Sequence, residues 1–78
     1  MIRELDAVAL AADLPDHGLK TGDVGTVVLV HGESGYEVEF MTLGGETLAV
    51  ASLSSQQIRP IGRREIAHVR SMEGVSPA

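Results

Sequence analysis

The chain has 78 residues, a formal net charge of −5 and no cysteine. A chain of this length forms one domain with a modest core, and the lack of cysteine excludes a disulfide framework and thiolate metal sites. The acidic N-terminal residues do not resemble a secretory signal and no apolar run approaches the ~20 residues of a membrane span, so we expect a cytoplasmic protein without membrane contact.

The first two predicted strands are separated by a long loop. Residues 6–11 form the first strand, and residues 24–31 form the second, which is rich in valine and apolar on both faces. The loop between them, residues 13–22, contains proline, glycine and aspartate, which favour turns. Its apolar residues Leu14 and Leu19 are expected to anchor it, so that it packs as a curled excursion and not as a tight hairpin.

Two glycines at a spacing of three, Gly22 and Gly25, lead into the second strand. Glycine is required where φ is positive or where another backbone approaches closely. The segment lacks the Lys-Ser/Thr pair and the following helix of a phosphate-binding loop. The sequence therefore predicts a tight turn that feeds a buried strand.

The third strand, residues 36–40, alternates strictly between apolar and acidic side chains. Its aromatic and valine side chains are expected to point inward, and Glu37 and Glu39 outward. Two carboxylates about 7 Å apart on one strand face could serve acid–base catalysis. Such a pair is more often the solvated face of an antiparallel strand, so we expect both glutamates to face solvent.

The fourth strand is predicted over residues 47–53, after a turn centred on two glycines, with Leu48 and Val50 on one face. A polar connector at residues 54–57 is expected to form one short helical turn. The fifth strand contains Pro60, which has no N–H to donate to a ladder. We therefore expect this last strand to lie at an edge of the sheet or barely to pair on that side.

Five short strands, a long first loop and two glycine hairpins, at residues 32–35 and 44–45, indicate an all-β fold, a small five-stranded SH3-like barrel over residues 1–61. Residues 62–78 are predicted to be a short, partly ordered, amphipathic C-terminal extension. In this extension Ile66 and Val69 have helical spacing, whereas Ala67 and Val69 would share a strand face. The segment is too short for its pattern to decide between helix and strand.

A local signature covers the first loop and the strands after it. It reads Leu-Pro-x-x-Gly-Leu-x-x-Gly-x-x-Gly-Thr-Val-Val over residues 14–28 and continues as Tyr-Glu-Val-Glu-Phe over residues 36–40. This signature resembles a widespread family of very short, uncharacterised bacterial proteins with SH3-like barrels. The Gly-x-x-Gly-x-Val portion is also similar to the KOW motif and to the barrel of the nitrile hydratase β subunit. The family resemblance implies no catalytic residues, and the neighbouring toxin genes ascribed to some members imply an antitoxin-like role.

The residues that could carry chemistry do not cluster in the sequence. The three histidines, His17, His31 and His68, lie far apart, and Asp13 and Asp16 beside the first of them are interpreted as turn residues. The chain has no cysteine nucleophile and no Gly-x-Ser-x-Gly elbow. We therefore expect no enzymatic activity, no catalytic residue, no cofactor and no metal.

Two segments remain as candidates for partner binding. The first loop lies where SH3-like barrels present a groove, although one tyrosine and one phenylalanine are too few aromatics for a proline-rich ligand. The extension either docks on its own barrel or joins a second subunit or another protein. The candidate residues are Leu14, His17 and Leu19 in the loop and Arg63, Arg64, Ile66, Val69 and Arg70 in the extension.

Charge bears on the kind of partner. Residues 1–58 carry a formal net charge of −7, whereas residues 59–78 carry one of +2 and contain four arginines. Nucleic-acid binding depends on cations that replace counterions along the phosphate backbone. The sequence therefore favours a non-catalytic protein-interaction module, an antitoxin-like or accessory partner of a neighbouring gene product or of a second copy of itself. The alternative is a KOW-like nucleic-acid-binding module, and a third reading is the accessory subunit of an enzyme.

Overall fold

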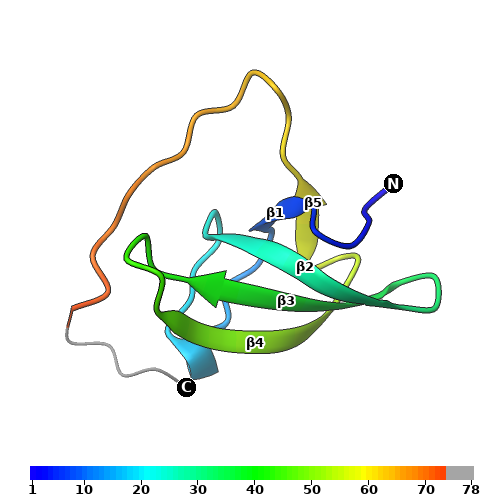
Figure 1. Cartoon of the computed structure of the whole chain (residues 1–78), viewed down its shortest axis with the longest axis horizontal. Coiled ribbons are helices and arrows are strands. Elements are labelled where there is room, and N and C mark those ends of the chain that lie inside the picture. Colours follow the sequence, from blue (N-terminus) through cyan, green and yellow to red (C-terminus); the bar gives the residue numbers. More distant parts are fainter. Residues whose placement is uncertain (74–78) are drawn as a thin grey trace.

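A computed structural model describes residues 1–73, and these residues form one antiparallel sheet. The end of the predicted extension, residues 74–78, lies outside the described part. The sheet has the strand order β4-β3-β2-β1-β5, and Figure 1 shows the long strands β2, β3 and β4 side by side, with the short strands β1 and β5 turned across them. The elements are β1 (Ala7–Leu10), the short helix η1 (Pro15–His17), β2 (Val24–His31), β3 (Gly35–Met41), β4 (Thr47–Ser54) and β5 (Ile58–Pro60).

The five predicted strands and the all-β class are confirmed, and the sheet curls into a barrel-like shape around one core. β5 ends the sheet order, as its proline predicted, and pairs with β1 alone. On β3 the alternation is as expected, since Tyr36, Val38 and Phe40 are buried, whereas the two glutamates between them are half-buried on the outer face. The largest side chains buried almost completely are Phe40, Leu10, Val8, Val27 and Val38.

β2 is less buried than its sequence predicted. Val27 is fully buried, but Val28 and Leu29 are 40% and 43% exposed. The register explains the difference, because Val27 pairs with Val38 and Leu29 pairs with Glu37, which leaves Val28 as an extra residue at a bulge. The prediction that this strand is buried on both faces was therefore wrong, because Val24, Val28 and Leu29 are exposed, while Val30 is only partly buried against the core.

β4 also departs from the predicted pattern. Leu48 is 7% exposed and Val50 is 53% exposed, so the predicted apolar face shared by these two residues was wrong. The register between β3 and β4 shifts between Phe40 and Met41, which makes Leu48 an extra residue in the ladder. Beyond this irregularity, alternate residues from Ala49 onward face the core.

The two glycines before β2 serve two different physical needs. Gly22 has a φ of +96°, a conformation that other L-residues rarely adopt. Gly25 is required for space, because a Cβ atom there would lie 2.6 Å from Cγ1 of Val38 and 2.9 Å from the carbonyl oxygen of Glu39. Of the two predicted roles of glycine, Gly22 therefore serves the turn and Gly25 serves the close approach of the strands.

The helical turn lies earlier in the chain than predicted. Among residues 1–73 it is η1 in the first loop, where Pro15 presets φ at the start and Gly18 ends the turn with a φ of +69°. Residues 54–57 instead form a simple turn, in which the N–H of Gln57 donates to the carbonyl of Ser54 at 3.0 Å. Within the described residues there is no helix with the length and apolar character that crossing a bilayer requires.

Candidate partner-binding surfaces

The first loop is curled and packed, as predicted. Leu14 and Leu19 exchange two backbone hydrogen bonds, of 2.9 and 3.1 Å, which close the loop around η1. Leu19 is 2% exposed and belongs to the core, while Leu14 is half-buried against the core. The structure therefore supports the anchor role for Leu19, because only a small part of this side chain is left for contact with a partner.

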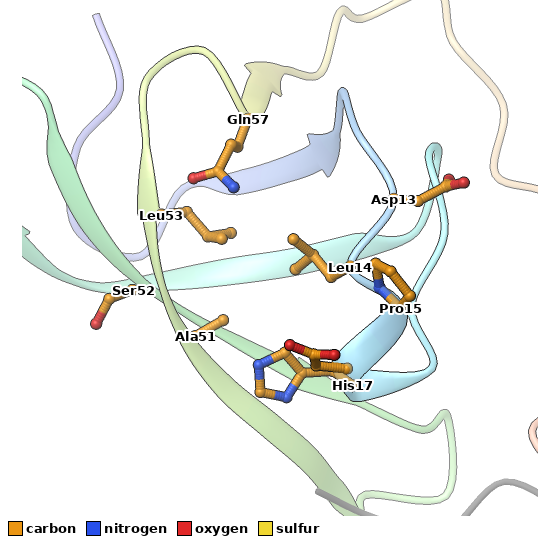
Figure 2. Close-up of a pocket in the computed structure, with 9 residues that line it drawn as sticks. Asp13, Leu14, Pro15, His17, Ala51, Ser52, Leu53 and Gln57 are labelled. Atoms are coloured by element: carbon orange, nitrogen blue, oxygen red, sulfur yellow. The ribbon is translucent and has the colours of Figure 1, made fainter.

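A small pocket of about 220 Å³ separates this loop from β4. Figure 2 shows the His17 ring lying against β4 near Ala51, with Leu14 and Leu53 facing each other above it. The Nδ1 atom of His17 is buried and has no hydrogen-bond partner among residues 1–73. The pocket is large enough for one side chain or a small polar molecule, and the imidazole could form one hydrogen bond there.

The carboxylate of Asp13, at the rim of this pocket, is hydrogen-bonded within the loop. Its Oδ1 accepts hydrogen bonds from the backbone N–H of Thr21 at 2.8 Å and from the Thr21 hydroxyl at 2.9 Å. These bonds, the backbone one above all, hold the pKa of Asp13 below its ordinary value. Among the described residues, no three histidine, aspartate or glutamate side chains are arranged to hold a metal ion.

The two glutamates of β3 are fixed by hydroxyls on β4 and not by each other. Glu37 accepts a hydrogen bond from Ser52 at 2.6 Å and lies 2.9 Å from Nε2 of His31, and Glu39 accepts one from Thr47 at 2.7 Å. The bond from Ser52 is the main cause that lowers the pKa of Glu37. A carboxylate that is held ionised in this way is poorly suited to act as a general acid.

The extension is neither helix nor strand over residues 61–73. Figure 1 shows it leaving β5 and running round one side of the sheet as a wide arc. Near its start, Arg59 and Glu65 form an ion pair of 2.8 Å, and Glu65 also accepts the N–H of Gly62 at 2.6 Å. The hydrogen bond between the two charged groups raises the pKa of Arg59 and lowers that of Glu65. After this turn, Ile66 is 95% exposed.

The extension docks on the barrel again at Arg70. The guanidinium donates from Nε to Oδ1 of Asp23 at 2.9 Å, from Nη2 to Oδ2 at 2.5 Å, and from Nη2 to the carbonyl of Gly18 at 3.1 Å. Partial burial raises the pKa of Asp23, but the hydrogen bonds from Arg70 and from the backbone of Lys20 outweigh it, so this pKa lies below its ordinary value. Met72 packs against the core beyond this ion pair.

An apolar groove of about 400 Å³ lies between the extension and the barrel, and we call it the extension groove. Its outer wall is residues 67–70 together with Met72, and its floor comes from the start of β2, the end of β3 and the hairpin between β3 and β4. The principal apolar residues of the barrel wall are Leu19, Val24, Phe40, Met41, Leu43 and Leu48.

The candidate residues from the sequence do not form one site. Leu14 and His17 line the pocket against β4, whereas Val69 and Arg70 line the extension groove. Ile66 and Val69 are exposed on the arc between the two ion pairs, and Arg63 and Arg64 are exposed within the turn that the Arg59–Glu65 pair closes.

The sequence did not identify Asp23 as the residue that binds Arg70. No local signal could have done so, because the two residues are 47 positions apart and many other acids were equally available.

A family model matches most of this chain. The model is described as a domain of unknown function (DUF4926) and matches residues 4–60, so the chain belongs to this family. The resemblance to an uncharacterised domain family is thereby confirmed. The match ends with β5, so the extension lies outside the matched residues. No curated protein and no solved structure matches the chain.

Proposed function

We propose that this member of the DUF4926 family is a non-catalytic protein-interaction module, the antitoxin-like or accessory partner of a neighbouring gene product. The observation that carries the proposal is the outer face of the extension. There Ile66 and Val69 are 95% and 72% exposed, and Arg63 and Arg64 are exposed beside them. Burial of two such apolar side chains by a partner stabilises a complex by about 1.5–3 kcal/mol each.

Two ion pairs prepare this face for binding. The Arg59–Glu65 pair fixes the chain just before Ile66, and the Arg70–Asp23 pair fixes it just after Val69. A segment held at both ends loses less conformational freedom when a partner binds it, so more of the contact energy contributes to affinity. The two interpretations of the extension, docking on its own barrel and binding another protein, are therefore compatible. Its inner side docks on the barrel, and its outer side is exposed for contact with a partner.

The same ion pairs weaken the case for nucleic acid. Of the four arginines in residues 59–78, Arg59 and Arg70 are neutralised by Glu65 and Asp23. Phosphate binding depends on cationic side chains that are not already paired with an acid. Residues 1–58, which form most of the barrel, are acidic. We therefore expect no binding of RNA or DNA oligonucleotides by fluorescence anisotropy at low salt. Binding that weakens steeply as salt rises would instead favour the KOW-like alternative.

The test of the proposed function is capture of a partner by the full-length chain in its native host. The tagged chain should recover a protein in stoichiometric amount, and the variant Ile66→Asp should lose it, since Ile66 is 95% exposed and does not line the extension groove. Leu5→Asp is the matched control, because Leu5 is 80% exposed but lies near the N-terminus, outside the extension. The proposal fails if Ile66→Asp and the control capture the same protein equally, or if no stoichiometric partner, a second copy included, is recovered.

A further inference from the structure

The extension groove contains a ready acceptor for a guanidinium group. The carboxylate of Asp23 and the carbonyl of Gly18 together accept three hydrogen bonds from Arg70. Both acceptors lie within the family-matched residues, whereas Arg70 lies outside them. The two parallel bonds to the carboxylate require a planar fork of donors, which arginine has and lysine does not. The geometry of this acceptor therefore matches a guanidinium group better than a single ammonium group.

Beside this acceptor, the apolar part of the groove is only partly filled. A space of about 400 Å³ remains with the extension in place, and it is lined by apolar side chains that include Phe40 and Leu48. On the barrel side, Met41 and Leu43 are still 48% and 92% exposed. Of the extension, Met72 packs against the core, whereas Val69 is 72% exposed. A segment with larger apolar side chains would bury more of this surface.

The extension is attached by side chains alone over this stretch. Within residues 1–73, no backbone–backbone hydrogen bond joins residues 66–73 to the barrel. The hydrogen bonds that hold it come from the single guanidinium of Arg70. Such an attachment can open without unpairing any strand, so the groove can exchange one occupant for another.

We infer that the extension groove is a peptide-binding site whose ligand is an extended segment of a partner protein, with an arginine that binds Asp23 and a large apolar residue close after it. The extension occupies this site in cis through Arg70 and Met72 and competes with that ligand. The inference rests on the proposed function only in that the protein is a binding module, because it concerns the acceptor formed by Asp23 and Gly18 and not the exposed side chain of Ile66.

The experiment uses the full-length chain and a fluorescent peptide with the sequence of residues 61–73, added in trans. Because the docked extension blocks the site, the apparent Kd of the wild type equals the intrinsic Kd divided by the fraction of molecules with an open groove. The variant Arg70→Ala releases the extension, so we expect it to bind the peptide about tenfold more tightly than the wild type, as measured by anisotropy. Arg3→Ala, which removes an exposed arginine near the N-terminus and outside the groove, should bind like the wild type.

Two further variants test the chemistry of the site. Asp23→Asn, introduced together with Arg70→Ala, should weaken peptide binding about tenfold or more, and a peptide with lysine in place of the arginine that corresponds to Arg70 should lose affinity similarly. Circular dichroism checks that each variant is folded.

The inference is overturned if Arg70→Ala and the wild type bind the peptide equally, if Arg70→Ala does not bind it at millimolar concentration, or if Asp23→Asn has no effect. It is also overturned if sedimentation shows a wild-type dimer that Arg70→Ala abolishes, because the occupant is then the extension of a second copy. The capture experiment and the peptide experiment use different residues, so either can fail while the other succeeds.

Discussion

Arg70 and Asp23 form a bidentate ion pair that ties the end of the extension to the turn before β2, across 47 residues of sequence. The side chains of Arg70 and Asp23 are 28% and 19% exposed, so water screens the pair less than it screens an ordinary surface ion pair. The barrel and its extension are therefore coupled through one geometrically specific contact.

This coupling is measurable in a double-mutant cycle. Arg70→Ala and Asp23→Ala, singly and together, should give a coupling free energy of about 1–2 kcal/mol in urea unfolding, because each single variant leaves the other charge partly buried without its partner. Arg64→Ala, which removes an exposed arginine from the same extension, should leave the unfolding free energy nearly unchanged. Additive effects of the two single variants would show that the ion pair does not hold the extension.

The docking of the extension should depend on pH in a defined direction. The pKa of Asp23 in the folded chain lies below its ordinary value of 3.8, so its contribution to stability is complete above that value and is lost as the pH falls through the lower folded pKa. In NMR spectra, the Arg70 Nε–H resonance should remain unchanged down to about pH 4 and shift below it. Asp23→Asn should remove this transition. A transition near neutral pH would contradict the assignment.

Gly25 should not tolerate a methyl group. A Cβ atom there would meet Val38, Phe40 and the carbonyl of Glu39 at 2.6–2.9 Å, so Gly25→Ala should destabilise the fold by about 1–3 kcal/mol through strand separation. Gly44→Ala is the matched control, because the nearest atom to its Cβ would be 3.8 Å away and its φ is not positive. Thermal and urea unfolding should separate the two variants, and equal stabilities would place β2 and β3 farther apart than described.

Two valines test the register of β2. Val38→Ala removes a fully buried side chain and should cost about 1–3 kcal/mol from lost burial and cavity formation. Val28→Ala should cost less than about 1 kcal/mol, because Val28 is the extra residue of the bulge and is 40% exposed. If the two substitutions destabilise the chain equally in urea unfolding, the bulge lies elsewhere in β2.

The amino-acid sequence by itself determined the elements that depend on local sterics. The alternation of residues 36–40 set the inner and outer faces of β3, Pro60 restricted the last strand to an edge, and the glycine pairs set the hairpins. The loop signature identified the uncharacterised family that the match over residues 4–60 confirms. These features were predictable because each rests on the conformation or polarity of neighbouring residues.

Tertiary structure alone decided where the bulges lie and which residues meet across the chain. Val28 and Val50 are apolar like their neighbours, and only the register of strand pairing turns them outward. Leu19 is buried because the loop closes on the core, and Arg70 binds Asp23 among eleven acids because the path of the extension brings residue 70 beside the turn before β2. A local pattern contains no information on such contacts, because they join residues that are distant in the sequence and are set by the path of the whole backbone.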